Sequence, residues 1–572
     1  MKKVLFYYLR PYYWRMIGGF FIKFIGTVMD LCLPWILAYM IDTIIPKKER
    51  SSLYLWGVMM IICSVLAWTF NIIANRMASK VARDTTEQIR HDLFAKISYL
   101  SNQQIDEFTK PSCISRLTTD TYYIHQMIGR VQRLGVRAPI LVIGGIFVTL
   151  TLDPILTAVL VSIMPFIILV TFFVSKKSIP LYANLQQAVD QFVRLIREDM
   201  AGIRVIKALS KTEYEKQKYD TLNQEVVRKE RIAGITMAAV NPCMNLLLNF
   251  GLVLVVIVGA YRVHIGVSEV GKILAFLTYF TIILNAMMNI SKMFIIISKA
   301  VASANRIMEV IETPEDMQVV QINPVQAAVS APYFLFDHVT FSYNKIEPNL
   351  FDLSFSLEKG ETLGIIGATG SGKSTLAQLF LRFYDPDQGN IYLEGKDIRT
   401  IPFEILRKKF GVVFQNDTIF EDSILENIRL GRKISFEEVQ NAVEYARAKE
   451  FIEEEGRGYE NTVSVRGANL SGGQKQRILI ARALAARPDI LILDDSSSAL
   501  DYKTDAFLRK ELKEHFPDTT TILIAQRISS VMQSDHILVL DEGKMIGYGT
   551  HQELMENCEI YREIGKTQMG EY

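Results

Sequence analysis

The sequence is poor in cysteine, has no excess of either charge, and contains no low-complexity tract. No CxxC pair occurs among its cysteines, which are Cys32, Cys63, Cys113, Cys243 and Cys558. This excludes a disulfide scaffold and a zinc site of familiar spacing, so we expect buried apolar thiols. With 63 Lys and Arg against 61 Asp and Glu, nothing indicates a nucleic-acid binder. The 17 prolines and 33 glycines are ordinary for 572 residues, which argues against disorder.

Long apolar runs, by contrast, are abundant. A helix crosses the roughly 30 Å hydrocarbon layer with about 20 residues, so six segments qualify as membrane spans. These are Met16–Ile45, Leu53–Ile73, the two parts of Ala138–Ser175 on either side of a tight turn at Asp153-Pro154, Ile232–Tyr261, and Ile273–Ser291. A cleaved signal peptide is not expected, because the first run is too long and lacks a clear cleavage site.

The loops between these runs predict the orientation. The stretch Ala74–Arg137 holds ten Lys and Arg and Lys176–Arg231 holds twelve, whereas the three short connections hold few. The positive-inside rule therefore places both long loops and both termini in the cytoplasm. Apolar residues recur with helical spacing inside these loops, which predicts two helical hairpins that reach below the membrane.

Polar residues recur at helical spacing in the fifth and sixth apolar runs. The two stripes consist of Asn241, Asn245 and Asn249, then Thr278, Thr281, Asn285 and Asn289. Amides facing lipid would be unsatisfied, so both stripes should face protein or a water-filled path, with helix–helix hydrogen bonding as the alternative. Lys23 and Asp30 share a face of the first run, where pairing or snorkelling explains them as well as a substrate role does.

The character of the chain changes after Lys292. Helix-like sequence continues to about Glu312, a proline-containing linker covers Thr313–Ala331, and Pro332–Tyr572 reads as an α/β domain. The strands expected in this domain are Tyr333–Phe336, Thr362–Ile366, Gly411–Phe414, Ile490–Leu493, Thr521–Ile524 and His536–Leu540.

A glycine-rich segment, Gly367–Thr375, joins one of these strands to the helical stretch Leu376–Phe383. It is a phosphate-binding loop in its required strand–loop–helix context, where backbone N–H groups and the helix N-terminus meet phosphates. Lys373 should reach the β- and γ-phosphates, and the Ser374 hydroxyl should hold Mg²⁺ near Asp494. The nucleotide contacts expected from this loop are Gly367, Thr369, Gly370, Ser371, Gly372, Lys373, Ser374 and Thr375.

The soluble domain resembles the nucleotide-binding domain of ATP-binding cassette (ABC) proteins. Leu470-Ser-Gly-Gly-Gln474 matches their signature sequence, and Tyr343, Gln415, Asp494 and Ser498–Asp501 occur in the family's order. The membrane half is similar to that of ABC exporters, and Phe108–Asp120 and Gly202–Glu215 are similar to stretches of their cytoplasmic loops. The resemblance implies a transmembrane domain at 1–312, a linker at 313–331, and a cytoplasmic ATPase domain at 332–572 that uses ATP and Mg²⁺.

The resemblance also implies roles for single residues. Tyr343 would stack on adenine, and Gln415 would sense Mg²⁺ or the γ-phosphate. The signature residues would close over ATP held by a second cassette, so a partner chain is obligatory. They are Ser471, Gly472, Gly473 and Gln474.

Three positions depart from the family pattern. Asp495 replaces the glutamate that polarises the attacking water, Gln526 replaces the switch histidine, and Ser464-Val-Arg-Gly467 replaces Gly-Glu-Arg-Gly. The aspartate carboxylate sits about 1.5 Å further back, and a misplacement of about 1 Å costs roughly 10²-fold in rate. We therefore expect a site that binds ATP and hydrolyses it poorly.

The departures resemble the degenerate-site subunit of bacterial heterodimeric ABC multidrug exporters. The partner should then carry the glutamate and the histidine, and the cargo should be amphipathic or hydrophobic. The alternatives are a lipid, peptide or siderophore translocator of the same architecture, or a regulatory or channel-like subunit that only binds ATP. The residues assigned to catalysis are Asp495, Gln526, Gln415, Ser471 and Gly473, and those assigned to the metal are Ser374, Gln415 and Asp494.

Overall fold

The computed structural model describes residues 2–320, 332–415, 417–454, 456, 458–496 and 500–569. The chain forms two compact units. One comprises Met1–Tyr99 and Lys110–Thr313, and the other comprises Leu100–Thr109 and Pro314–Tyr572. The described part of the first unit is helical apart from its turns, and the second unit contains two β-sheets.

The first unit is built on six helices that are long and apolar enough to cross a membrane, within the described part of the chain. They are α2 (Tyr13–Tyr39), α4 (Arg50–Tyr99), α8 (Val136–Leu152), α9 (Pro154–Ala201), α12 (Val240–His264) and α13 (Val270–Ile311). The six spans predicted from hydropathy are therefore confirmed. Several of these helices continue far beyond their apolar segments, because charged residues follow with the same helical spacing.

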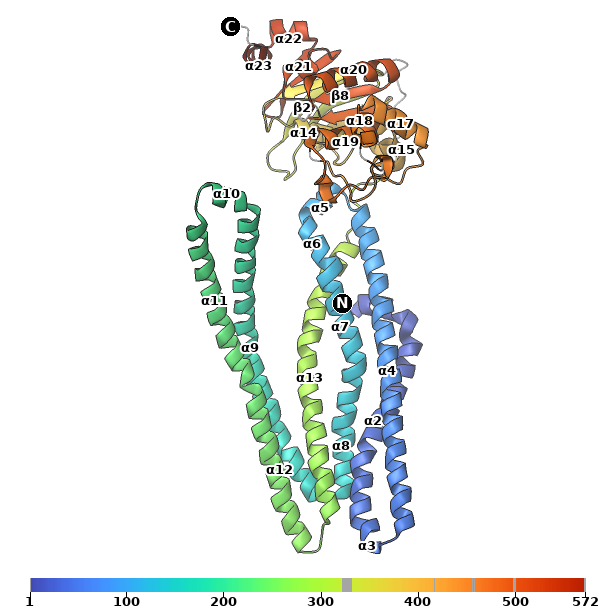
Figure 1. The fold of residues 1–572 in the computed structure, drawn as a ribbon, viewed down its shortest axis with the longest axis vertical. Coiled ribbons are helices and arrows are strands. Elements are labelled where there is room, and N and C mark those ends of the chain that lie inside the picture. The colour runs from blue at the N-terminus through green and yellow to red at the C-terminus, as the bar shows by residue number, and fades with distance from the viewer. Residues whose placement is uncertain are drawn as a thin grey trace. The chain divides into compact units, whose positions relative to one another are not determined.

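Two helical hairpins extend from the spans, as the loop sequences predict. The second is the simpler one: α9 packs along α11 (Thr212–Ala238), and the short helix α10 (Ile203–Ala208) lies at the tip (Figure 1). The first joins α4 to α8 through shorter helices. These are α5 (Asn102–Phe108), which groups with the second unit, α6 (Lys110–Ser115) and α7 (Thr121–Arg130), while α1 (Lys2–Leu9) and α3 (Ile45–Lys47) complete the first unit.

The predicted tight turn between the third and fourth spans is present at Asp153. Its carboxylate accepts hydrogen bonds from the backbone N–H groups of Ile155 at 3.0 Å and Leu156 at 3.3 Å, which caps α9. Asp153 also pairs with Arg262 of α12 at 2.8 Å. One aspartate thus ends α8, begins α9 and ties both to the end of α12.

Most residues of the polar stripes of the last two spans lie on faces that the chain itself leaves uncovered, whereas Asn289 is half-buried. Asn245, Asn249, Thr278, Thr281 and Asn285 are exposed, while the side chain of Asn241 lies outside the described residues. The Thr278, Thr281 and Asn285 side chains donate to carbonyls of their own helix. These three groups are satisfied locally rather than by bonds between helices.

The cysteine prediction is wrong at two positions. Cys63, Cys113 and Cys558 are buried, but Cys32 is half-buried and Cys243 is exposed on α12. A thiol is weakly polar, so a membrane helix can present it on an outer face without an unsatisfied group.

The second unit contains a six-stranded sheet in the order β10-β9-β3-β8-β7-β6 and a four-stranded sheet in the order β2-β1-β4-β5. In the larger sheet all neighbours are parallel except β9 and β10. Its strands are β3 (Thr362–Gly367), β6 (Phe410–Val413), β7 (Ile490–Asp494), β8 (Thr520–Ile524), β9 (His536–Asp541) and β10 (Lys544–Gly549). Those of the smaller, antiparallel sheet are β1 (Phe334–Phe341), β2 (Leu350–Leu357), β4 (Gln388–Leu393) and β5 (Lys396–Asp397).

All six strands expected from sequence are present in this α/β fold. The sequence analysis missed β2, β4, β5 and β10, which pair antiparallel and are less continuously apolar. The helices of this unit besides α5 are α14 (Lys373–Phe380), α15 (Phe403–Lys408), α16 (Ile424–Arg429), α17 (Phe436–Tyr445), α18 (Lys449–Glu454), α19 (Gly472–Leu484), α20 (Tyr502–His515), α21 (Ile528–Val531), α22 (His551–Asn557) and α23 (Glu559–Met569).

Candidate nucleotide site

The order of the larger sheet brings four distant segments to one edge. The carboxyl ends of β3, β8, β7 and β6 are neighbours, since parallel strands end at the same side of a sheet. A cavity of about 330 Å³ lies there. Its lining comprises Asn349, Thr369, Gly370, Gly372, Lys373, Ser374, Thr375, Gln415, Asp494, Asp495, Ile524, Ala525 and Gln526. Most residues predicted for nucleotide and metal therefore surround one cavity.

The phosphate-binding loop has the backbone that its glycines predict. Gly370 and Gly372 have φ values of 87° and 99°, where a side chain would be strained. A Cβ at Gly367 would lie 2.1 Å from the carbonyl oxygen of Leu540, so only glycine fits. The helix after the loop, α14, begins at Lys373, three residues earlier than predicted, with Gly372 at its N-cap.

Lys373 is buried and folded back over its own loop. Its ammonium group donates to the carbonyl oxygens of Gly367 at 2.8 Å and Ala368 at 2.7 Å. Burial lowers the pKa of Lys373, while the nearby carboxylates of Asp494 and Asp495 raise it. A cation held here by neutral carbonyls is suited to an anionic ligand.

Ser374 and Asp494 form the oxygen-rich part of the cavity. Asp494 ends β7 and is 5% exposed, and burial raises its pKa, against a hydrogen bond with the Ser374 side chain that lowers it. A hydroxyl beside a carboxylate provides the oxygen ligands that Mg²⁺ prefers. The chemistry of this pair therefore fits the metal that a P-loop nucleotide brings with it.

Asp495 contacts both Gln526, the other single-residue departure from the family pattern, and Gln415. Its Oδ2 accepts hydrogen bonds from the side-chain amides of Gln415 at 3.2 Å and Gln526 at 3.4 Å. These residues follow β7, β6 and β8, so three strands contribute one side chain each. Asp495 has a φ of 48°, a left-handed conformation, and its N–H donates to Ile524 O at 2.8 Å.

Tyr343 lies at the α14 side of the site rather than in the cavity lining. Its hydroxyl lies 3.4 Å from Thr375 Oγ1 and donates to Gln378 Oε1 at 3.2 Å. The ring is 40% exposed and packs edge-on against Tyr384 and Phe341. The Tyr343 ring is thus an aromatic surface beside the phosphate loop, held in place by Tyr384 and Phe341.

Asn349 lines the cavity, and its side chain accepts a hydrogen bond from the Tyr343 N–H. The sequence analysis did not predict it, because no motif marks this position.

The signature residues are kept apart from this cavity. Ser471 caps α19, its hydroxyl accepting from Gln474 N–H while Gln474 Oε1 accepts from Ser471 N–H. Gly472 and Gly473 are the first residues of α19, and Ser471 and Gly472 are exposed.

Two further predictions have different outcomes. Ser371 is buried in the phosphate-binding loop and does not line the cavity. Ser498 and Ala499, used for the resemblance, lie outside the described residues.

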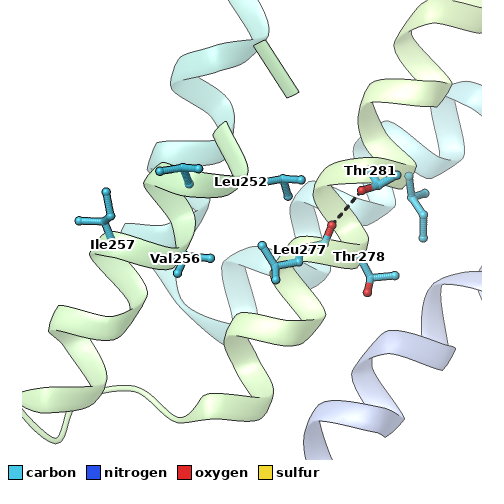
Figure 2. Close-up of a pocket in the computed structure, with 8 residues that line it drawn as sticks. Leu252, Val256, Ile257, Leu277, Thr278 and Thr281 are labelled. Carbon is cyan, nitrogen blue, oxygen red and sulfur yellow. Dashed lines mark hydrogen bonds between the residues drawn. The ribbon is translucent and has the colours of Figure 1, made fainter. Parts of the chain in front are cut away.

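A second cavity of about 600 Å³ lies between α12 and α13 in the membrane unit (Figure 2). It is lined by Leu252, Val253, Val256, Ile257, Leu277, Thr278, Thr281 and Ile282. The Thr281 hydroxyl donates to the Leu277 carbonyl at 3.0 Å, as Figure 2 shows. With their hydroxyls satisfied in this way, Thr278 and Thr281 leave a mainly apolar groove.

The fold and the site define a P-loop ATPase joined to a six-helix membrane domain, and comparison with known proteins agrees. Residues 16–287 match the family model of the ABC transporter transmembrane region, and residues 350–498 match the family model described as ABC transporter. The ABC transporter ATP-binding protein YfiB of Bacillus subtilis is 35% identical over 100% of this chain and 99% of its own length. Rv1273c of Mycobacterium tuberculosis is 30% identical over 98% and 97%.

The structural comparison gives the same result. A bacterial Atm1-family ABC exporter, solved with ATP bound, has a TM-score of 0.82, is 25% identical, and each chain covers 98% of the other. This chain belongs to the ABC transporter family. It is a half-transporter with the exporter fold: a multi-pass membrane protein whose ATP-binding domain is cytoplasmic.

Proposed function

We propose that this chain is one subunit of a heterodimeric exporter that moves amphipathic or hydrophobic, drug-like compounds out of the cell. Its own nucleotide site would retain ATP and hydrolyse it slowly, while its signature would complete a competent site on the partner chain. One observation carries this proposal. The carboxylate at the nucleotide cavity is the shorter Asp495, and it accepts hydrogen bonds from the side-chain amides of Gln415 and Gln526.

The residues of the site have separable roles in this proposal. ATP supplies the phosphoryl group that water attacks. Lys373 would neutralise phosphate charge, and Ser374 and Asp494 would hold Mg²⁺. Asp495 Oδ2 would have to receive the proton of the attacking water. The carboxylate of Asp495 is set about 1.5 Å further back than that of a glutamate would be. Gln526 can donate a hydrogen bond, but it cannot carry the positive charge of an imidazolium.

The signature end of α19 would act on the partner's nucleotide. Ser471 and the first N–H groups of the helix present donors and a positive helix end to solvent. Donors aimed at charge that develops during phosphoryl transfer lower the barrier. Since these groups are intact, the site that they complete would carry most of the hydrolysis, provided that the partner supplies glutamate and histidine.

Two other functions remain candidates for the same architecture. A translocator of lipids, peptides or siderophores would use the same exposed stripes on α12 and α13 as its path. A regulatory or channel-like subunit would bind ATP without moving cargo. ATP-dependent uptake by inside-out vesicles that hold both chains separates an exporter from a regulatory subunit.

The experiment that tests the proposal compares two variants of this chain in the reconstituted pair. Gly473→Glu should nearly abolish ATPase activity, because it blocks the donors offered to the competent site. Lys373→Ala should weaken ATP retention at the degenerate site and slow turnover without abolishing it. The chain purified alone should hydrolyse ATP very slowly. A greater loss from Lys373→Ala than from Gly473→Glu would reverse the assignment of the two sites.

A further inference from the structure

Four charged side chains act on one another where α2, α4 and the start of α8 meet. We call Lys23, Asp30, Arg133 and Arg137 the basic cluster. Asp30, Arg133 and Arg137 are the charged neighbours of Lys23. Lys23 and Asp30 come from α2, Arg133 from the π-helical turn Val131–Gly135, and Arg137 from α8.

The basic cluster contains more positive than negative charge. Arg137 pairs with Asp30 at 2.9 Å, and this is the one ion pair in the cluster among the described residues. Lys23 is 3% exposed and donates to Asn75 Oδ1 at 3.0 Å, and Arg133 donates to the Gly129 carbonyl at 3.0 Å. Both of these cations thus have neutral partners. Three cations against one carboxylate leave a formal charge of +2.

The position in the membrane makes this excess costly. Arg137 directly precedes the apolar part of α8, and Lys23 lies within the apolar run of α2, toward its cytoplasmic end. The helices around it pack closely: a Cβ at Gly26 would lie 3.0 Å from Phe70 Cβ of α4. Charges in such a place are expected to be paired or to mark a ligand path.

Hydrogen-bond donors in the same segment are also unused. Arg137 Nε and Gln132 Nε2 are buried and have no hydrogen-bond partner among the described residues, although buried polar atoms normally find one. The Arg137 side chain is nevertheless 40% exposed, so part of its guanidinium group is accessible. Unused donors beside uncompensated cations suit the oxygens of an anion.

We propose that the basic cluster binds the head group of an amphipathic anion, and that such anions are the cargo of this exporter. This inference rests on the proposed export function and names its substrate class. The ligand needs an apolar body as well, because α2 exposes Phe20 and Phe24 one turn or less from Lys23. A sulfonate, sulfate, carboxylate or phosphate on an apolar tail meets both requirements, whether it belongs to a free compound or to an inner-leaflet lipid.

The test uses the full transporter in phosphatidylcholine nanodiscs, with empty discs subtracted. Three probes share one alkyl tail: decanesulfonate, decyltrimethylammonium and decyl glucoside. Decanesulfonate should bind at least tenfold more tightly than the cation. In the double variant Lys23→Met, Arg133→Gln its affinity should fall about tenfold, which corresponds to about 1.4 kcal/mol. Arg76→Gln, Lys80→Met removes two exposed cations of α4 and should leave the affinity unchanged.

The double variant leaves the Arg137–Asp30 ion pair intact, and it keeps an unbranched side chain at position 23 and a hydrogen-bond donor at position 133. Equal binding of the anion to the wild type and this variant would overturn the proposal, as would tighter binding of the cation. Discs with added phosphatidylglycerol distinguish a free compound from a membrane lipid as the natural ligand. If this anionic lipid competes with decanesulfonate, the basic cluster binds a lipid head group and not a cargo.

Vesicle transport separates the two proposals. ATP-driven uptake of the cation but not of the anion would overturn the substrate class and leave the export function standing. Binding of the anion without uptake of any probe would count against the export function and against the anion as cargo. Uptake of decanesulfonate that the double variant lowers and the Arg76, Lys80 control does not would support both.

Discussion

At the scale of single residues, the expectation of slow hydrolysis at the nucleotide site depends most on Asp495. Its left-handed backbone, with a φ of 48°, is strained for a residue with a side chain, yet its N–H is bonded to Ile524 O of the neighbouring strand. The sheet therefore fixes where the Cβ of this residue lies. A longer side chain at the same place would extend the carboxylate further into the cavity without moving the backbone.

The first prediction uses this fixed backbone. Asp495→Glu and Gln526→His should each raise hydrolysis at this site only slightly, and the double variant should raise it by more than the product of the two effects. Both side chains act on one transition state, so their effects are not additive. The measurement is single-site turnover in a pair whose competent glutamate is replaced by glutamine. Robust turnover before any repair would remove the case for an asymmetric mechanism.

A second residue-scale feature is Arg382, which is fully buried. Its guanidinium group pairs with Asp385 at 2.9 Å and donates to the carbonyl oxygens of Ile398, Arg399 and Gln318. Gln318 lies in the segment that enters the ATPase domain. One side chain therefore satisfies three carbonyls and fixes the start of the domain against its smaller sheet.

The second prediction follows from these bonds of the Arg382 guanidinium group. Arg382→Met should destabilise the ATPase domain by about 3 kcal/mol and lower its unfolding midpoint by about 6–12 °C, because it removes the ion pair with Asp385 and the hydrogen bond to the Gln318 carbonyl. Differential scanning fluorimetry of the full chain measures this shift. Arg407→Met is the matched control, since the exposed Arg407 stacks on the same Phe403 ring but donates no comparable set of bonds. Equal shifts for both variants would contradict the assignment.

At the scale of elements, the short helix α5 groups with the ATPase domain although its sequence lies between α4 and α6. Asp106 accepts a hydrogen bond of 2.6 Å from the hydroxyl of Tyr384, and Gln104 donates to the Pro314 carbonyl at 2.7 Å. Burial, followed by the bond to Asp106, raises the pKa of Tyr384, so its proton stays in place at physiological pH. The Tyr384 ring in turn packs edge-on against Tyr343, with centroids 5.1 Å apart.

This chain of contacts gives the third prediction. Tyr384→Phe keeps the ring against Tyr343 and removes only the bond to α5. Transport per ATP hydrolysed should fall several-fold while ATP affinity stays unchanged, since a hydrogen bond to a charged group contributes about 1.5–3 kcal/mol. Paired transport and ATPase assays measure the ratio. Tyr333→Phe is the control, because the buried Tyr333 hydroxyl has no hydrogen-bond partner in the described part of the chain. An unchanged ratio in Tyr384→Phe would show that this bond carries no coupling.

At the scale of the whole molecule, the hairpin of α9, α10 and α11 carries exposed apolar side chains. Around its tip Met200 is 64% exposed, Val205 60% and Leu209 64%. These three residues lie at the end of α9, in α10 and directly after it, and Figure 1 shows this segment as the tip of the hairpin. Exposed apolar patches of this kind mark surfaces that a partner covers.

The fourth prediction concerns this tip. In a chain whose exposed Cys243 is replaced by serine, Val205→Cys should react with maleimide at least tenfold more slowly in the assembled transporter than in the isolated chain. Burial against the partner removes access to the thiol. Lys359→Cys, in an exposed turn of the ATPase domain, should react at the same rate in both states. Unchanged labelling of Val205→Cys on assembly would mean that another surface forms the interface.

Comparison of the whole structure with the sequence shows which features could be predicted. The six spans, the tight turn at Asp153 and the phosphate-binding loop were predicted, because hydropathy, capping and glycine spacing act over a few neighbouring residues. The antiparallel strands β2, β4, β5 and β10 were missed, since their mixed burial gives a weaker pattern than the parallel strands. The exposure of Cys243 was missed as well, because it depends on which face of α12 packs.

What the sequence determined by itself is therefore local: which segments are helices and strands, which lie in the membrane, and which short motifs bind phosphate or cap a helix. The tertiary structure alone decided which distant residues meet. Strand order brings Gln415 and Gln526 onto Asp495 from 80 and 31 residues away in the chain, and helix packing leaves Lys23 with a neutral partner beside two arginines. Periodicity fixes the direction of a side chain within its own element, whereas its partners depend on how the elements pack.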